Sequence, residues 1–436
     1  MIESNTILKY KATGLEWMPK VPVHWEALRI KNLFKEMDSR SETGSEELLS
    51  VSHYTGVTLK RESLENEDDH LSNAGSLVGY KLVAKNDLVI NIMLAWNGSL
   101  GISPFNGITS PAYCVYRITG NNNPEYFGYL FTTNLFKAEF RRNSTGIIDS
   151  RLRLYSDKFF SIFTVVPPKD EQDEIVQYIK VQEEKINLFI QKKRRFIELL
   201  KEQRQIVIHQ VVTKGLNQKV KLKSSGIEWL GDIPTHWEIR RLKECLIGKL
   251  KYGANESGEE YNPTWYRYIR ITDFSLDGKL SEENKLSLSP EIGAEYALQD
   301  GDILFARSGA TVGKTFQFHY VSEEEKYCYA GYLIKATPDK NIILSDFLFN
   351  YTNSKAFENW KNSIFNKATI ENIGADKYSV LKIPIPPIDE QKQIVAHIKT
   401  ETATIDTAIS KTEREIELIK EYKEAMIAEA VMGKRK

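Results

Sequence analysis

Residues 167–214 read PPKDEQDEIVQYIKVQEEKINLFIQKKRRFIELLKEQRQIVIHQVVTK, and a related stretch occupies residues 386–433. Both stretches open on the pattern PPxDEQ. The two prolines keep the chain extended and prevent an earlier helix start. The acidic residues that follow fall in the first turn, where they favour the positive end of the helix dipole. No further proline or glycine interrupts either run, so each stretch predicts one long helix.

Apolar residues recur along both runs in steps of four and three, which is the spacing of a coiled-coil seam. Polar residues break the seam at the same three steps in each run. About 43 helical residues span roughly 65 Å, too far to be buried on one small domain, so we expect the two seams to pack on each other. Two unrelated surface helices are the alternative, but they leave the matched breaks unexplained. The predicted seam comprises Ile179, Ile186, Ile190, Ile197, Leu200 and Val207, and Ile398, Ile405, Ile409, Ile416, Ile419 and Met426.

A second repeat opens each half of the chain. Residues 13–34 read TGLEWMPKVPVHWEALRIKNLF, and residues 225–246 read SGIEWLGDIPTHWEIRRLKECL. Repeats of this size are duplicated domains rather than solenoid units. Neither His-Trp pair has an evident partner, so we expect Trp25 and Trp237 to cap a core rather than form a site. Between these landmarks lie divergent, short β-rich runs bounded by Gly, Asn and Asp, which indicate an α+β fold.

The length of 436 residues predicts two or more domains. The repeats divide the chain into a first domain, a central helix, a second domain and a C-terminal helix. We place these four parts at 1–166, 167–214, 215–385 and 386–436. The shared frame around divergent interiors implies two domains of one fold with different binding surfaces.

Composition limits the location and the partners of the chain. With 59 basic and 59 acidic residues the formal net charge is zero, so any DNA-binding surface must be local. The three cysteines, Cys114, Cys245 and Cys328, form neither a disulfide framework nor a metal knuckle, which favours a reducing cytoplasm. The N-terminus lacks the apolar core of a signal peptide, and the apolar runs are too short to span a bilayer. We therefore expect a cytoplasmic protein without a membrane partner.

Local basic segments are the candidate DNA-binding surfaces. Residues 137–158 carry six basic and three acidic side chains in a loop-rich stretch. In the second half, arginines and lysines lie among Tyr, Trp and Asn. Arginine suits base edges and lysine suits phosphate. The candidates are Arg141, Arg142, Arg151, Arg153, Arg267, Arg270, Arg307, Ser308, Lys314 and Lys367.

The loop at residues 309–315 reads GATVGKT and is similar to a phosphate-binding P-loop. It has three residues between its glycines, whereas the P-loop motif requires four. The following residues also lack the long helix of a βαβ unit. We expect Lys314 to contact a DNA phosphate instead. The chain shows no metal-ligand cluster, nucleophile elbow or paired-carboxylate signature, so we predict no catalytic residue, no metal and no catalysis by this chain alone.

The order of these motifs resembles the specificity (S) subunit of type I restriction–modification systems. The resemblance rests on the two PPxDEQ helices, the repeated Trp-Pro-His-Trp openings and the stretch GDILFARSGATVGKT at residues 301–315. It implies two target recognition domains, each reading half of a bipartite, asymmetric site in double-stranded DNA. It also implies that the two helices form an antiparallel coiled coil that separates these domains. The first half matches more loosely, since residues 94–103 read LAWNGSLGIS.

The resemblance further implies that two modification (methyltransferase) subunits and restriction (motor nuclease) subunits assemble on this chain. Those partners use S-adenosylmethionine, ATP and Mg²⁺, and no cofactor is expected on this chain itself. Two alternatives stay open. The chain could serve a methyltransferase alone, without a nuclease, or it could be a coiled-coil NTPase or scaffold that uses the loop at residues 309–315.

Overall fold

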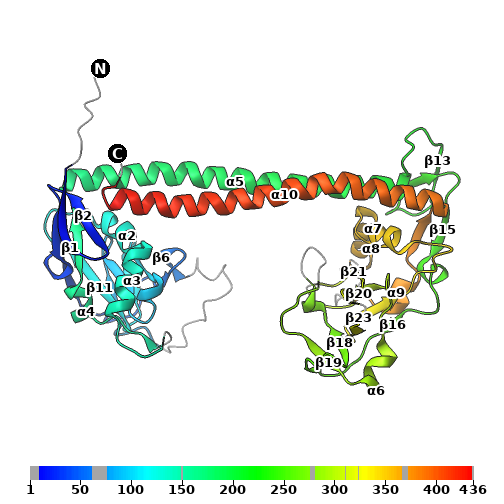
Figure 1. Cartoon of the computed structure of the whole chain (residues 1–436), viewed down its shortest axis with the longest axis horizontal. Coiled ribbons are helices and arrows are strands. Elements are labelled where there is room, and N and C mark those ends of the chain that lie inside the picture. The colour runs from blue at the N-terminus through cyan, green and yellow to red at the C-terminus, as the bar shows by residue number, and fades with distance from the viewer. Residues whose placement is uncertain are drawn as a thin grey trace. The chain divides into compact units, whose positions relative to one another are not determined.

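The computed structural model describes residues 9–60, 76–148, 151–274, 280–309, 311–322, 324–365 and 372–434 (Figure 1). The chain forms two compact units. Unit 1 comprises Met1–Lys193 with Arg414–Lys436, and unit 2 comprises Arg194–Glu413. Each unit therefore combines a mixed α+β body with segments of both long helices. The four parts expected from the sequence follow chain order, whereas these units take a share of each helix.

The two long helices are α5 (Lys169–Lys214) and α10 (Ile388–Val431). Each helix begins within two residues of its proline pair. The proline rings prevent the helix from starting earlier in the chain. In unit 1, Glu183 Oε1 lies 3.0 Å from Lys423 Nζ, and Lys193 Nζ lies 2.5 Å from Glu415 Oε2. From the first ion pair to the second, the residue number rises along α5 and falls along α10, so the two segments run antiparallel. In unit 2, an ion pair of 3.0 Å between Arg204 and Asp406 continues the same order.

Burial along the helices follows the predicted seam. The seam side chains are buried or half-buried, while most of the residues between them are exposed. Two of the polar breaks, Glu183 and Lys423, meet each other, and Lys193 and Arg204 each find a carboxylate on the other helix. A polar residue in an apolar seam specifies register. The buried seam residues are Ile179, Ile186, Ile197, Leu200, Ile398, Ile405, Ile416 and Met426, and the half-buried ones are Ile190, Val207, Ile409 and Ile419.

The body of unit 1 is built on a four-stranded antiparallel sheet in the order β4-β11-β8-β9. All four residues of β8, Leu88–Asn91, are buried, because apolar side chains cover both faces of this central strand. The hairpin of β5 and β6 contributes a cluster with Val89 and Val115 on one face. Sheet strands and helices of this body are β4 (Phe34–Met37), β11 (Tyr113–Ile118), β9 (Leu100–Ile102), β5 (Leu49–Ser52), β6 (Gly56–Leu59), α2 (Pro124–Thr132), α3 (Asn134–Asn143) and α4 (Ser156–Ser161).

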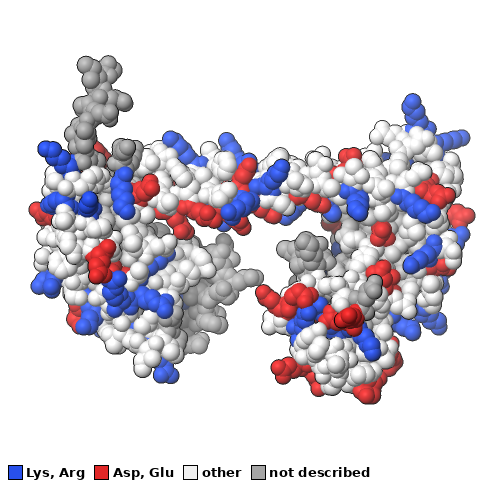
Figure 2. Space-filling view, viewed as in Figure 1, with Lys and Arg blue, Asp and Glu red and all other residues white. Residues whose placement is uncertain are grey.

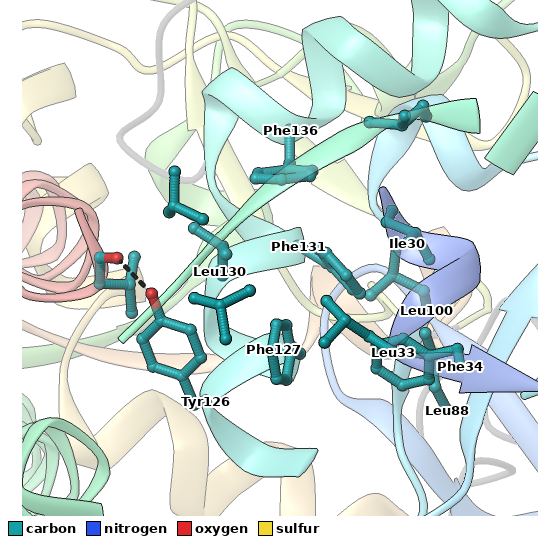
Figure 3. Close-up of a cluster of buried hydrophobic side chains, with 14 of the residues drawn as sticks. Ile30, Leu33, Phe34, Leu88, Leu100, Tyr126, Phe127, Leu130, Phe131 and Phe136 are labelled. Atoms are coloured by element: carbon teal, nitrogen blue, oxygen red, sulfur yellow. Dashed lines mark hydrogen bonds between the residues drawn. The ribbon is translucent and has the colours of Figure 1, made fainter. Parts of the chain in front are cut away.

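Aromatic side chains from α2 and α3 fill the other face of this sheet (Figure 3). Phe34 of β4 meets Phe127 edge to face at 5.5 Å between ring centroids, and Phe131 lies 5.0 Å from Phe136. The Tyr126 hydroxyl donates a hydrogen bond of 2.8 Å to the Val431 carbonyl oxygen at the end of α10. The core thus joins sheet, helices and the last turn of α10 in unit 1. Smaller strand pairs complete the unit: β1 (Tyr10–Leu15) with β2 (Met18–Pro22), β3 (Glu26–Arg29) with β12 (Phe163–Val166), and β7 (Lys81–Val83) with β10 (Gly107–Thr109).

Unit 2 repeats this sheet in the order β16-β23-β20-β21, again antiparallel. Two helices follow β23 as α2 and α3 follow β11. A further sheet, in the order β17-β19-β18-β22, has no equivalent four-stranded sheet among the described residues of unit 1. The elements are β16 (Lys251–Tyr252), β23 (Leu333–Ala336), β20 (Ile303–Ala306), β21 (Thr315–Gln317), β17 (Glu259–Glu260), β19 (Leu286–Leu288), β18 (Tyr266–Ile269), β22 (Lys326–Tyr329), β13 (Leu222–Ser224), β14 (Asp232–Pro234), β15 (Glu238–Arg241), β24 (Lys382–Ile385), α6 (Pro290–Gly293), α7 (Ser345–Thr352), α8 (Lys355–Phe365) and α9 (Ala375–Ser379).

The glutamine of the first PPxDEQ motif joins α5 to the body of unit 1. Gln172 is fully buried. Its Nε2 donates to the Pro167 carbonyl oxygen at 2.8 Å and to Asn122 Oδ1 at 2.9 Å. Its Oε1 accepts from the backbone N–H of Asn123 at 2.7 Å. Asn123 in turn caps α2, so this one side chain links the start of α5 to the start of α2.

Unit 2 builds the same contact from the second motif. Gln391 is fully buried and donates from Nε2 to the carbonyl oxygens of Pro386 and Ile342, both at 2.9 Å. Its Oε1 accepts from the backbone N–H of Leu344 at 2.8 Å, directly before α7. The duplication therefore extends to individual hydrogen bonds.

The neighbouring glutamate corrects one expectation from the sequence, because the His-Trp pairs do have a partner. Glu171 Oε2 lies 2.7 Å from His24 Nε2 and accepts from Trp25 Nε1 at 3.0 Å. In unit 2, Glu390 makes the same contacts with His236 and Trp237 at 2.8 and 3.1 Å. Both tryptophans are fully buried, as predicted for residues that cap a core.

We expect Gln172→Ala to lower the free energy of unfolding by about 2–4 kcal/mol, because buried backbone groups lose their partners. Denaturant unfolding of the full chain measures this loss. Gln191→Ala, on an exposed position of the same helix, is the matched control and should leave stability within about 0.5 kcal/mol of the original. Equal stability of the two variants would contradict an anchoring role for Gln172.

Candidate nucleic-acid interface

The loop between β20 and β21, residues 307–314, is the first part of the candidate interface in unit 2. Gly313 donates its N–H to the Ala306 carbonyl oxygen at 2.9 Å, and the N–H of Ala306 binds the Lys314 carbonyl oxygen at 2.9 Å. Lys314 is exposed. A P-loop leads from a strand into a helix, whereas this loop joins two antiparallel strands. Residues 309–315 are therefore not a P-loop, and the NTPase alternative loses the motif on which it depended.

Arg307 and Ser308 lie at the base of this loop. The Arg307 carbonyl oxygen accepts from the N–H of Ile373 at 2.9 Å, and Ser308 forms a bridge with Asn372. The Arg307 guanidinium carbon lies 5.2 Å from the ring centroid of Tyr252. The loop thus meets the chain segment that precedes α9, and a stacked tyrosine orients its arginine.

Two buried polar atoms in this place have no hydrogen-bond partner among the described residues: Arg307 Nε and Asn372 Oδ1. Buried polar groups are nearly always paired, so such atoms need an explanation. Two exposed tyrosines are adjacent: Tyr252 stacks on Arg307, and the Tyr332 carbonyl oxygen accepts from the Arg307 N–H at 3.0 Å. Arginine and asparagine are side chains that bind guanine and adenine edges.

Arg267 and Arg270, by contrast, are held by carboxylates of the protein. The Arg267 side chain is 3% exposed, with Nη1 at 3.0 Å from Glu282 Oε1 and 3.6 Å from Glu325 Oε2. Arg270 pairs with Asp273 at 2.8 Å. These two predicted DNA contacts therefore have structural partners, and we leave them out of the interface. The predicted contact at Lys367 lies outside the described residues.

In unit 1 the equivalent loop is residues 92–99, between β8 and β9. The N–H of Leu154 binds the Ile92 carbonyl oxygen at 2.9 Å, just as Ile373 binds Arg307 in unit 2. The Arg141 guanidinium carbon lies 5.5 Å from the Trp96 ring centroid. The structure therefore brings together the loop, α3 and the segment before Leu154.

The other candidates of unit 1 lie on these same segments. Arg142 pairs with Glu139 at 2.8 Å on α3. Arg153 is half-buried, donates to the Leu152 carbonyl oxygen at 2.8 Å and forms a bridge with Thr145. Arg151 is exposed. The basic stretch at 137–158 thus lies beside the β8–β9 loop, although no sequence pattern connected the two.

Sequence reasoning missed four residues of these two sites: Trp96, Tyr252, Tyr332 and Asn372. Each is separated in sequence from the loop it accompanies or is a single aromatic residue without a motif. Trp96 and the tyrosines could have been flagged only as aromatic residues interleaved with basic ones. The distribution of charge does not mark either site, because basic and acidic side chains are interspersed over both units on the face drawn in Figure 2.

Two other kinds of site are absent from the part of the chain that the structure describes. Within it, no group of His, Cys, Asp and Glu side chains could hold a metal ion, and no helix is long and apolar enough to cross a membrane. The three cysteines are free and buried. Burial raises the pKa of Cys245 to about 11 and that of Cys328 to about 12, so both remain protonated thiols rather than nucleophiles.

Residues 234–418 match the family described as the type I restriction modification DNA specificity domain. This stretch covers most of unit 2 and the first part of α10. Residues 234–418 thus match a DNA specificity domain, and the relatives of the chain are named specificity subunits of type I restriction enzymes. The family description and the names of the relatives identify DNA-specificity components rather than catalytic subunits.

Two relatives illustrate the extent of the similarity. The type I restriction enzyme MjaVIII specificity subunit of Methanocaldococcus jannaschii is 24% identical over 95% of this chain and 94% of its own length. The EcoKI specificity subunit of Escherichia coli (strain K12) is 32% identical over 47% of this chain and 44% of its own length. A chain of a solved type I restriction–modification system superposes with a TM-score of 0.68 at 14% identity, covering 95% of this chain and 99% of that one. The last likeness shows a shared fold, with mixed α+β bodies and two long helices.

Arg267→Ala should lower the free energy of unfolding by about 3 kcal/mol, because it leaves the nearly buried Glu325 without its arginine. Thermal unfolding followed by circular dichroism measures this effect on the full chain. Arg151→Ala, which removes an exposed arginine, is the comparison and should change stability by less than about 0.5 kcal/mol. A stable Arg267→Ala protein that binds DNA more weakly would return Arg267 to the interface.

Proposed function

We propose that this chain recognises a bipartite, asymmetric site in double-stranded DNA for a type I restriction–modification enzyme. One observation carries the proposal: the same four-stranded sheet is built twice, and the loops that join its inner strand to its edge strand differ between the copies. A duplicated scaffold with unlike loops is suited to reading two different sequences. The match of residues 234–418 to the DNA specificity domain supports the same function.

The loop residues support asymmetry in particular. Ile92 in unit 1 and Arg307 in unit 2 accept the same backbone hydrogen bond, yet one side chain is apolar and the other is cationic. The residues directly before the two donors of that bond also differ: Arg153 precedes Leu154, and Asn372 precedes Ile373. Each pair would contact different bases, because arginine, asparagine and apolar side chains favour different base edges. Two unlike half-sites follow from this difference.

We further propose that two modification subunits bind this chain, one on each long helix. The residues 195–202 of α5 and 414–421 of α10 repeat one surface. Arg195 pairs with Glu198 and Glu202 at 2.9 and 3.8 Å, and Arg414 pairs with Glu417 and Glu421 at 3.0 and 3.8 Å. Within these ladders lie two exposed leucines, Leu199 and Leu418, at matching positions. Two copies of one surface suit two copies of one partner.

In this proposal the partners perform the chemistry. The modification subunits use S-adenosylmethionine to methylate a base that is flipped out of the duplex. Restriction subunits, where present, use ATP and Mg²⁺, and this chain binds none of these groups. The complex acts in the cytoplasm. A chain that serves a methyltransferase alone is the alternative, and the genes beside it decide between the two.

The proposal predicts that each unit reads one half-site. Exchanging residues 30–160 for the equivalent segment of another family member should change one half of the methylated motif, because the β8–β9 loop lies inside that segment. Methylome sequencing of cells that carry the chimera and the same methyltransferase measures the motif. A change in both halves would contradict separate readers. If deleting the gene leaves every methylated motif in place, the proposed function itself is wrong.

The partner surface gives a second prediction. Leu199→Asp and Leu418→Asp should each remove one modification subunit from the complex, and the double variant should remove both, since each places a charge in an apolar contact. Native mass spectrometry of co-expressed subunits measures the stoichiometry. Gln205→Asp adds the same charge at an exposed position of α5 and should retain two subunits. Loss of both subunits in either single variant would show that the two contacts are not independent.

A further inference from the structure

A lysine of α8 lies across the glycine of the β20–β21 loop in unit 2. Gly313 has φ of +76°, and a Cβ added there would lie 2.2 Å from Lys361 Cδ and 3.3 Å from Lys361 Nζ. The left-handed backbone conformation favours glycine at this position, and the lysine side chain lies directly over it. The lysine ammonium is thus held against the loop that also carries the exposed Lys314.

Unit 1 repeats this arrangement with a different residue spacing. Gly98 of the β8–β9 loop has φ of +87°, and a Cβ added there would lie 2.7 Å from Lys137 Cε and 3.6 Å from Lys137 Nζ. Lys137 belongs to α3, which corresponds to α8 in the order of elements. The two loops otherwise differ in sequence, so the shared feature is one glycine beneath one lysine.

Neither lysine is neutralised by the protein. Both side chains are half-buried, and no carboxylate among the described residues lies within ion-pair distance of either ammonium. Other basic residues of the same helices are paired, as Arg142 is with Glu139 and Lys355 is with Glu358 at 2.8 Å. Burial lowers the pKa of Lys361; Glu358 offsets part of this shift, and the charge of Lys314 lowers the pKa by a smaller amount. A half-buried ammonium without a counter-charge is costly, and an anion would relieve that cost.

We propose that Lys137 and Lys361 are equivalent DNA-backbone contacts, each holding one phosphodiester against the glycine of its loop. The inference rests on the proposed function, and it separates the residues that position DNA from those that read it. The positioning pair is the same in both units, whereas the loop residues Ile92 and Arg307 differ. Lysine suits this role because it binds phosphate as a point charge and carries no preference among bases.

The test measures DNA binding by the complex of the full chain with its methyltransferase subunits. The probes are a duplex with the motif found by methylome sequencing and a scrambled duplex of equal length. Fluorescence anisotropy between 50 and 200 mM NaCl gives the affinity and its salt dependence. The variants are Lys137→Ala, Lys361→Ala and the double variant. Lys31→Ala and Lys243→Ala are the matched controls, because these exposed lysines occupy equivalent positions of the two units outside the loops.

Each single variant should lower affinity about five- to ten-fold at 0.1 M salt and reduce the salt slope by about 0.9, and the double variant by about 1.8. The loss should be the same for both duplexes, and the methylated motif should not change. Lys361→Arg should retain most of the slope, which shows that charge rather than packing is responsible. Thermal unfolding identifies any alanine variant that fails to fold. The corresponding arginine variant then replaces it, and we expect that variant to retain most of the salt slope.

Three results would overturn the inference: an unchanged slope in both single variants, an effect confined to one unit, or a change of the motif itself. These outcomes differ from failure of the proposed function. If the complex of the unsubstituted chain does not prefer its motif duplex, the proposed function fails. If that complex prefers its motif duplex and the lysine variants match the controls, only the role of the two lysines is wrong.

Discussion

Each unit depends on a buried glutamine whose hydrogen-bonding atoms are all occupied. Gln172 and Gln391 lie in the first turn of a long helix and bind backbone or amide groups about 50 residues earlier in the chain. A buried amide is stable only when its donors and acceptor are satisfied, and a partly satisfied one is worse than an apolar residue. This requirement leaves one position for the α+β body against the helix start. The proline pair supports it, because a helix that began earlier would move the glutamine out of register.

The duplication allows two copies of one fold to be compared within a single chain. Features that both units share are those the scaffold needs: the glutamine anchor, the Glu–His–Trp contact, the ladder around Leu199 and Leu418, and the glycine beneath a lysine. Features that differ at equivalent positions are free to encode specificity. This criterion is the basis for proposing that Ile92 and Arg307 act in recognition and that Lys137 and Lys361 act in positioning. The division follows from geometry within one chain.

The long helices, the seam spacing and the duplication could be predicted from the sequence, because periodicity and proline chemistry act locally. The site could be predicted only in part. Lys314 and Arg307 could be proposed as candidates because they lie in one short glycine-rich stretch. Arg267 looked the same in sequence, among aromatic residues, yet it is buried against Glu282 and Glu325. Neither its two carboxylates nor the partner of His24 could be found from local patterns, since these contacts join residues that only the tertiary fold brings together.

The difference between basic residues that are paired with carboxylates and those that are not explains how a chain of zero net charge can present a surface for DNA. Counting charges treats all 59 basic residues alike. In the structure many of them are compensated within a few ångströms, as Arg195 and Arg414 are in the helix ladders. Lys137, Lys361 and Lys314 have no such partner among the described residues. Solvent and salt ions surround these ammonium groups, and a phosphate that approaches them displaces those ions. Affinity for DNA then depends on which cationic side chains have no carboxylate partner in the folded protein. The net charge of the sequence does not give this information, because the tertiary fold determines which charges are paired.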